Sequence, residues 1–309
     1  MSIIYGFNQT HTINQLTNNK CKIIPSAVQR IINEIPSKRR EVIRFPGGTV
    51  ANEYNVNIFG HTLSEAKSSK WASFKINPIE PFIEASKIIG WKVIPVLNIT
   101  DIYNDKISFD SGMDLNFKML DMFLDAGIKV EHIELGNELN IWMRIKGNKD
   151  YNKNVDEYNR EIEKYYDLSV RVYNSVKNRY PKIKIGGVSA RDGMNARDNK
   201  WCSLFDKGPW EAIIIHHYED SGDKKDWESN IKKMVEQSKN NNKEIWITEL
   251  NVRLGPSVTS AAYINNASQS WIQDYQNKIW DICEDIGVDL MCYHRITGTD
   301  NHSYNYLRF

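Results

Sequence analysis

The feature that most constrains the fold of this chain is a regular alternation of short β-rich runs with longer helical stretches. Eight runs are rich in Ile and Val, and several are almost wholly apolar, which is typical of parallel strands covered on both faces. The predicted strands are Ile3–Phe7, Glu41–Phe45, Lys92–Asn98, Glu131–Asn137, Lys182–Val188, Ala212–Tyr218, Glu244–Leu250 and Asp289–His294. Eight strands with helices between them in 309 residues predict the α/β class and a (β/α)₈ TIM barrel.

Helical patterns occupy most of the intervals between these strands. They are Pro25–Ile35, Pro78–Ile89, Asp114–Ala126, Asp156–Arg179, Asp226–Asn240 and Ser268–Ile286. Only 15 residues follow His294, so we expect the last helix to be short or missing. A doubly wound sheet is the structural alternative, but Gly47-Gly48 is not the G-x-G-x-x-G turn that such a fold normally carries. No linker divides the chain, so residues 1–309 are expected to form a single catalytic barrel domain.

Composition excludes several function classes. The chain has 40 basic and 39 acidic side chains. It therefore lacks the excess positive charge of a general nucleic-acid binder. No apolar run approaches the roughly 20 residues of a membrane span. The N-terminus lacks the basic and apolar regions of a secretory signal peptide, so we expect a cytoplasmic protein, with non-classical release left open. The four cysteines have no zinc-site spacing, and we expect no metal and no cofactor. The oligomeric state is not indicated.

Two predicted strands carry a glutamate at their C-terminal tip. Glu138 directly follows strand 4, Glu249 is the last residue but one of strand 7, and about three β/α units of roughly 30–40 residues separate the two. Side-chain alternation predicts Glu249 on the face of Ile247, and Glu138 on the face of Glu134. Barrel enzymes hold their active sites at these strand ends. Two carboxylates facing one cleft are what a glycosidase needs, whereas either glutamate alone would be read as a surface residue.

These motifs resemble the large clan of retaining (β/α)₈ glycoside hydrolases, which carry Asn-Glu at the end of strand 4 and Glu at the end of strand 7. Arg44–Gly48 together with Leu135–Glu138 is most similar to the arabinofuranosidase, xylosidase and heparanase-like branches. The resemblance implies that Glu138 is the general acid/base and Glu249 the nucleophile. It also implies hydrolysis of O-glycosidic bonds through a covalent glycosyl-enzyme intermediate, with an oligo- or polysaccharide as substrate.

The resemblance implies supporting roles for further residues. Asn137 would hydrogen-bond the sugar 2-hydroxyl, and Arg44 would keep the nucleophile ionised. His216 and Tyr218 match a His-x-Tyr on strand 6, where Tyr218 would donate to Glu249 and His216 would line the site.

Aromatic residues near the strand ends could contact the sugar. The clan usually has a Trp at the end of strand 8, where this chain has Tyr293 and His294, so either one of these forms the floor of the site or the floor is absent. Trp142, and also Tyr54 and Trp201, could stack on a sugar ring, with ordinary packing as the alternative for each.

Four alternatives stay open. Arg44 could form a structural ion pair with Glu134 instead of supporting Glu249. A metal-dependent hydrolase would combine His216, Glu249 and His294, although no H-x-H or H-E-x-x-H spacing supports it. A catalytically silent glycan-binding barrel is the alternative from another class. Arginines after several strand ends suggest an acidic substrate such as a uronic acid, unless they are solvated or paired; they are Arg144, Arg191, Arg253 and Arg295.

Overall fold

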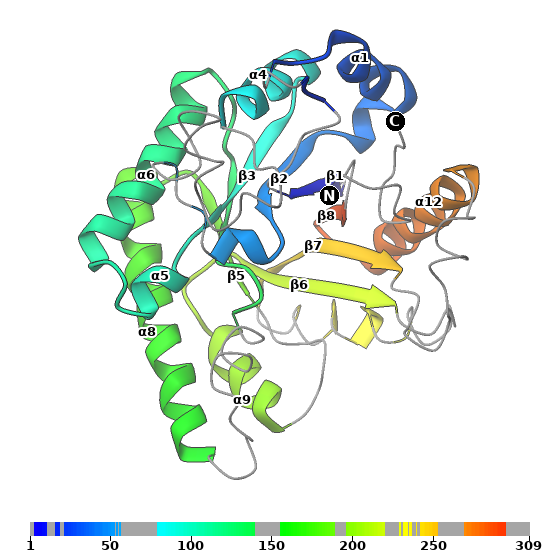
Figure 1. Ribbon diagram of the computed structural model, residues 1–309. Helices are drawn as coiled ribbons and strands as arrows, with labels where there is room; N and C mark the ends of the chain where they lie inside the picture. The colour runs from blue at the N-terminus through cyan, green and yellow to red at the C-terminus, as the bar shows by residue number, and fades with distance from the viewer. Residues whose placement is uncertain are drawn as a thin grey trace, which may run out of the picture.

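Eight parallel strands close into a barrel in chain order, with β1 paired to β8 (Figure 1). The computed structural model describes residues 3–10, 16–18, 22–52, 54, 56, 79–139, 155–188, 196–219, 229, 231–233, 235–236, 239, 242–252 and 269–294. The strands are β1 (Ile4–Thr10), β2 (Val42–Gly47), β3 (Lys92–Leu97), β4 (His132–Leu135), β5 (Lys184–Val188), β6 (Ala212–Glu219), β7 (Glu244–Val252) and β8 (Leu290–His294). All eight predicted strands are therefore confirmed, and with them the (β/α)₈ barrel.

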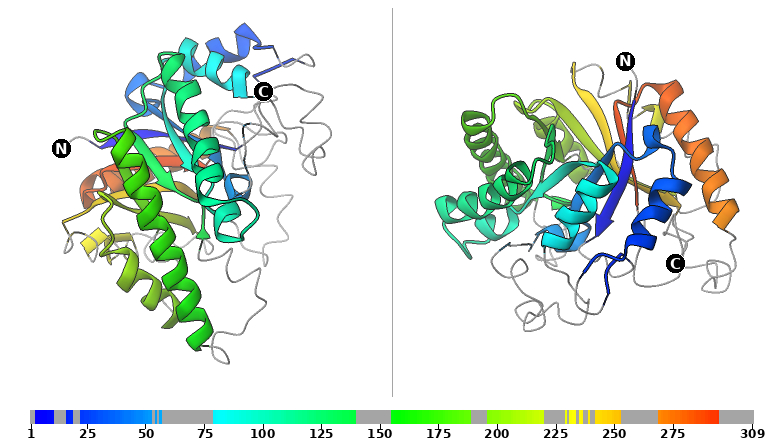
Figure 2. Two further views of the ribbon diagram at one scale, coloured as in Figure 1. Left: turned by 90° about the vertical axis from the view of Figure 1, so that its left-hand side faces the viewer. Right: turned by 90° about the horizontal axis from the view of Figure 1, so that it is seen from above.

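Helices surround the barrel, as the two views of Figure 2 show. They are α1 (Pro25–Glu34), α4 (Ile79–Ile89), α5 (Thr100–Tyr103), α6 (Phe109–Asp125), α8 (Val155–Arg179), α9 (Ala196–Phe205) and α12 (Gln269–Ile286), with the 3₁₀ helices η1 (Ser37–Arg39) and η2 (Thr49–Asn52). No helix among the described residues is both long enough and apolar enough to cross a membrane.

Helix boundaries differ from the prediction where capping decides them. α6 begins at Phe109, ahead of the predicted Asp114, because the Ser108 side chain accepts a hydrogen bond from the Ser111 amide and caps the helix. α5 and α9 were not predicted, since α5 is a single turn and the pattern of α9 is irregular. The predicted helix Asp226–Asn240 is described only in part, and its described residues include helical ones. The residues after β8 lie outside the described part of the chain, so the short or missing last helix stays a prediction.

Two apolar layers make up the core. The larger fills the space between the strands and the helices and contains outward-facing strand residues such as Ile43, Ile213 and Ile247. The smaller lies inside the barrel and consists of Val42, Ile94, Ala212, Ile214, Trp246, Leu290 and Cys292. This inner layer closes the barrel below the site.

A buried polar layer lies directly above the inner apolar layer. Arg44 follows the inward-facing Val42 by two residues on β2, and His216 follows the inward-facing Ile214 by two residues on β6. Strand alternation therefore places both Arg44 and His216 inside the barrel, where both are buried. Glu134 enters the same layer from β4. The layer faces the C-terminal ends of the strands, where barrel enzymes hold their catalytic groups.

Candidate active site

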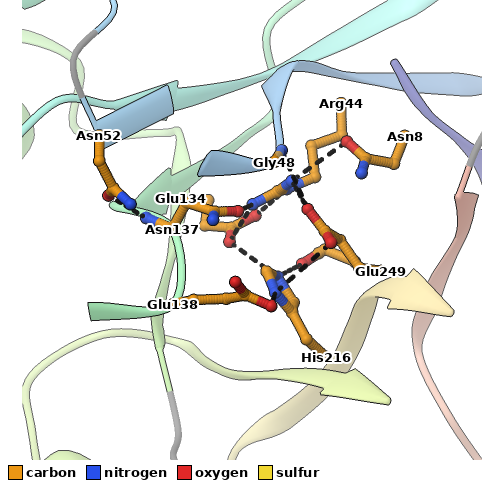
Figure 3. A network of polar contacts seen from close by, with 10 residues as sticks. Asn8, Arg44, Gly48, Asn52, Glu134, Asn137, Glu138, His216 and Glu249 are labelled. Carbon is orange, nitrogen blue, oxygen red and sulfur yellow. Dashed lines mark hydrogen bonds and ion pairs between the residues drawn. The ribbon is translucent and has the colours of Figure 1, made fainter. Parts of the chain in front are cut away.

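Arg44 is the centre of the polar layer, and each of its five N–H donors has an acceptor (Figure 3). Nε and Nη2 donate to the two carboxylate oxygens of Glu134, the Nη2 bond being 2.7 Å long. Nη2 also donates to Oδ1 of Asn137 at 2.8 Å. Nη1 donates to Oε1 of Glu249 at 2.7 Å and to Oδ1 of Asn8 at 3.1 Å. Only an arginine can supply this planar set of donors.

Arg44 therefore makes both of the contacts that the sequence left open. It neutralises Glu134, and it also holds Glu249. Burial alone would raise the pKa of Glu134, but the charge of Arg44 and hydrogen bonds from His216 and Arg44 keep that pKa below its usual value. Glu134 is consequently an ionised carboxylate inside the barrel.

Glu249 reaches the barrel interior through a β-bulge in β7. Between Ile247 and Leu250, β7 has one residue more than the stretch of β8 with which it pairs. Ile247 and Leu250 both pack in the outer core, whereas Thr248 and Glu249 both contact groups inside the barrel. The prediction that Glu249 shares a face with Ile247 is therefore wrong, because the bulge interrupts the alternation.

Glu138 reaches the site from a turn rather than from a strand. β4 ends at Leu135, and the chain then passes through Gly136 at φ +77° and Glu138 at φ +46°. The predicted strand end at Asn137, and the alternation that placed Glu138 above Glu134, are wrong for that reason. A left-handed backbone costs a residue with a side chain about 1–2 kcal/mol, and such strain is concentrated at functional sites. The Glu138 side chain is 25% exposed, so it lies at the mouth of the barrel.

His216 lies between three carboxylates. Its Nε2 is 3.3 Å from Oε1 of Glu134 and 3.0 Å from Oγ1 of Thr248, and its Nδ1 is 3.4 Å from Oε1 of Glu138 and 3.9 Å from Oε2 of Glu249. Burial alone would lower the pKa of His216. The charge of Glu249 and the hydrogen bonds to Glu134 and Glu138 outweigh that effect and raise the pKa to about 10. The surrounding carboxylates therefore favour the imidazolium form of the ring.

The Gly47-Gly48 pair allows two close contacts. A Cβ on Gly47 would lie 1.9 Å from Oδ1 of Asn8, so a glycine here leaves room for Asn8 to reach Arg44. The Gly48 amide, at φ +73°, donates to Oε1 of Glu249 at 3.1 Å. The sequence placed a Gly-Gly pair after strand 2 but did not indicate these contacts.

Asn137 is fully buried, and its position is set by its neighbours. Its amide N–H donates to Oδ1 of Asn52 at 3.3 Å, and its own Oδ1 accepts from Arg44. Its Nδ2 is buried and has no hydrogen-bond partner among the described residues. This side-chain amide thus has donors to offer to a bound group.

Three residues of the polar layer were not predicted as site residues from the sequence: Asn8 and Thr248 were not singled out, and Glu134 was given only a structural role. Asn8 and Thr248 contact Arg44 and His216, and Glu134 contacts both of those cations. The only signal that could have found Asn8 is its inward alternation on β1, level with Arg44 in the register of the two strands.

Of the aromatic predictions, Tyr293 as the floor of the site is wrong, whereas Tyr54 and Trp201 show the ordinary packing that the sequence left open for them. Tyr293 is 1% exposed and faces outward, edge-on to Phe7 in the core between strands and helices, because the inward positions of β8 are Leu290 and Cys292. Tyr54 and Trp201 are buried as well, and each packs edge-on or stacked against a phenylalanine.

Other predicted residues lie outside the described part of the chain. Tyr218 is the seventh residue of β6, and His294 is the last residue of β8. The structure describes the backbone of each but not the side chain. Trp142 also lies outside, as do the four arginines on which the acidic-substrate hypothesis rests: Arg144, Arg191, Arg253 and Arg295.

A metal ion fits this arrangement poorly. Glu138, His216 and Glu249 do offer one ligand atom each within 4.8 Å of one another. However, an ion would have to displace a proton from His216, whose pKa the surrounding carboxylates raise, and this competition weakens binding.

Comparison with known proteins connects the chain to solved structures only. No protein-family model and no curated protein sequence matches it. The chain is similar to an α-L-arabinofuranosidase from Thermotoga maritima, solved as an arabinose complex, with TM-score 0.61, 15% identity, and coverage of 98% of this chain and 65% of that one. A family 51 α-L-arabinofuranosidase from Bifidobacterium longum gives TM-score 0.62, 11% identity, and coverage of 95% and 67%.

A third similar structure is a β-glucuronidase from Bacteroides uniformis, covalently bound to cyclophellitol-6-carboxylate aziridine. Its TM-score is 0.59 at 11% identity, with coverage of 94% of this chain and 30% of that one. This chain has the fold of these glycosidase barrels. It spans just under two thirds of the length of the Thermotoga structure and under a third of the Bacteroides one.

Proposed function

We propose that this protein is a retaining glycoside hydrolase, with Glu249 as the nucleophile and Glu138 as the general acid/base. The observation that carries the proposal is that Glu138 and Glu249 each present a carboxylate oxygen within 4.8 Å of the other at the C-terminal end of the barrel. Retaining glycosidases hold their two carboxyl groups about 5–5.5 Å apart, whereas inverting enzymes need roughly 6.5 Å or more to admit a water molecule. Arabinofuranosidases and a β-glucuronidase with the same fold support the reaction class.

In the first step, Glu249 attacks the anomeric carbon. The bond from that carbon to the leaving oxygen breaks, and the proton of Glu138 passes to the departing oxygen. Arg44 and the Gly48 amide both donate to Oε1 of Glu249, which holds the carboxylate ionised and fixes its orientation. The other oxygen, Oε2, which lies 3.9 Å from Nδ1 of His216, would form the bond to carbon.

In the second step, Glu138 takes a proton from a water molecule that displaces Glu249 from the sugar. Both displacements invert the anomeric carbon, so the product keeps the configuration of the substrate. The unpartnered Nδ2 of Asn137 suits a hydrogen bond to a sugar hydroxyl beside the reacting carbon. Such a bond strengthens as positive charge develops on the sugar ring.

Fewer observations bear on which sugar is cleaved than on the type of reaction. The structures with this fold include arabinofuranosidases, which act on a neutral pentoside, and a glucuronidase, which acts on a uronide. We keep the acidic sugar as a hypothesis, to be decided by comparing turnover of nitrophenyl uronides with that of nitrophenyl pentosides and hexosides. Activity confined to neutral glycosides would remove it.

The proposal is tested with a panel of nitrophenyl glycosides and three forms of the full chain. We expect the wild type to release nitrophenol from at least one glycoside, and Glu249→Ala to lose about 10³-fold or more in kcat. Azide should restore turnover of Glu249→Ala and yield a glycosyl azide of inverted configuration. Glu131→Gln is the control, because Glu131 pairs with Lys92 on the outer surface and should leave kcat unchanged.

Two outcomes would contradict the proposal. Wild-type activity in Glu249→Ala would show that another group is the nucleophile. Binding of a polysaccharide by the wild type, without release of reducing sugar from it or of nitrophenol from any glycoside, would favour the catalytically silent glycan-binding barrel.

A further inference from the structure

The site holds a third carboxylate that the two-step reaction does not use. Glu134 is fully buried and lies in the same polar layer as Arg44 and His216. One of its oxygens, Oε1, accepts from Nη2 of Arg44 at 2.7 Å and lies 3.3 Å from Nε2 of His216. A single carboxylate thus connects the two cations of the site. A buried carboxylate is costly unless each of its oxygens is paired, and both oxygens of Glu134 are.

The charges of the described site balance when Glu138 carries its proton. Glu134 and Glu249 are then negative, and Arg44 and His216 are positive. Cys292 on β8 adds no charge, because burial raises the pKa of its thiol. The ionisable groups facing His216 in the described part of the chain are Arg44 from β2, Glu134 from β4, Glu138 after β4 and Glu249 from β7.

The two ring nitrogens of His216 face different partners. Nε2 faces Glu134 and Thr248, which are fixed and buried, whereas Nδ1 lies between Oε1 of Glu138 at 3.4 Å and Oε2 of Glu249 at 3.9 Å (Figure 3). These last two oxygens belong to the groups whose charge changes during the proposed reaction. One end of the ring is therefore anchored while the other is aimed at the reacting carboxylates.

We propose that Glu134 is a positioning residue that holds His216 as an imidazolium, whose Nδ1–H interacts with Glu249 and Glu138 in turn. This inference rests on the proposed function. Before the first step the negative charge is on Glu249. When Glu249 forms its bond to the sugar it becomes a neutral ester, and Glu138, having given its proton to the leaving oxygen, becomes the anion. The imidazolium is close to both oxygens, so the site stays neutral without any proton leaving His216.

Glu134 is required for this because its charge does not change. Glu249 loses its charge when it forms the covalent intermediate, and Glu138 is uncharged until that intermediate forms. Among the described residues, only Glu134 provides His216 with a constant anion through both steps, and it does so while also neutralising Arg44. A neutral residue at this position would leave two buried cations facing one mobile negative charge.

The direct test is the protonation state of His216 in the full-length protein labelled with isotopic nitrogen in its histidines. We expect both ring nitrogens of wild-type His216 to remain protonated from about pH 6 to beyond about pH 9. In Glu134→Gln, which keeps the shape and removes the charge, the titration should move down by about two pH units or more. Glu131→Gln, a substitution beside the same strand, should leave it unchanged.

Kinetics give a second readout that a purely structural role would not produce. On the best nitrophenyl glycoside, Glu134→Gln should lower kcat by about tenfold or more above neutral pH with KM within about twofold. Activity should recover as the pH falls, because acid restores the imidazolium. Glu134→Asp keeps the charge and should recover part of kcat without any change of pH.

The outcomes separate this inference from the proposed function. If wild-type His216 titrates near its ordinary pKa while glycosides are hydrolysed, the inference is overturned and the hydrolase stands; this measurement needs no variant and holds even if Glu134→Gln fails to fold. An unchanged His216 titration in Glu134→Gln also overturns it. If His216 behaves as expected and no glycoside is cleaved, the positioning role of Glu134 in catalysis fails together with the proposed function.

Discussion

Thr248 and Glu249 are neighbours in β7, yet both side chains point into the barrel. Thr248 lies 3.0 Å from Nε2 of His216, and Glu249 accepts from Arg44 at 2.7 Å. A regular strand would send one of the two outward into the helix layer. The bulge therefore places the proposed nucleophile against Arg44 without giving up the contact that steadies His216.

Arg44 should be essential to folding as well as to activity. Arg44→Met removes the closer of the two cations that pair with buried Glu134, and breaking a buried pair in this way costs about 3–5 kcal/mol. We expect the urea midpoint to fall accordingly, and Arg44→Lys to recover only part of it because a lysine lacks the planar set of five donors. Arg30→Met is the control, since the Arg30–Glu34 pair on α1 is solvent-accessible and should be worth under about 1 kcal/mol. Equal losses in the two variants would contradict the central role of Arg44.

The contact between Gly47 and Asn8 is testable by a double-mutant cycle. Gly47→Ala would place a methyl group 1.9 Å from Oδ1 of Asn8 and should push that side chain away from Arg44. The lost acceptor should cost about 1–3 kcal/mol in the free energy of unfolding. In an Asn8→Ala background the same substitution has nothing to displace and should cost much less. Additive effects of the two substitutions would show that the steric contact is unimportant.

Two buried histidines should make stability depend on pH in opposite directions. Burial lowers the pKa of His132 to about 4, so the unfolded chain binds this proton first and stability falls as the pH drops from 6.5 towards 4. The pKa of His216 is raised to about 10, so its contribution is complete below 6.5 and is lost as the pH rises through about 10. We therefore expect maximal stability near neutral pH.

Urea unfolding from about pH 5 to about pH 10 checks this expectation. His132→Gln should flatten the acidic side by at most about 3 kcal/mol and leave the alkaline side unchanged. His216→Gln should flatten the alkaline side instead. An acidic side that is unaffected by His132→Gln would contradict the assignment of that slope to His132.

Most of the fold could be predicted from the sequence because buried parallel strands have an unmistakable composition. Runs such as Ile213–Ile215 are covered on both faces, and glycines such as Gly90 end the helices between them at positive φ. α9 was missed because its apolar residues follow no regular helical period, and tertiary packing of Trp201 on Phe205 stabilises it.

The site was predictable in its chemistry but not in its local geometry. The sequence singled out Glu138 and Glu249, but strand alternation does not hold at either residue. Glu138 lies at a left-handed turn, and Glu249 lies in a β-bulge. Neither feature has a sequence signal, since the bulge contains no glycine and Glu138 is not a residue that favours positive φ. Tyr293 was placed in the site because the register of β8 could not be fixed by its short apolar run.

The most direct test of the central claim is covalent trapping of the nucleophile. The wild type is incubated with an activated fluoroglycoside of whichever sugar the nitrophenyl panel identifies, and peptide mass spectrometry then locates the label. We predict a single glycosyl adduct on Glu249, which should not form in Glu249→Ala. A label on Glu134 or Glu138, or continued hydrolysis with inverted configuration and no adduct, would contradict the account.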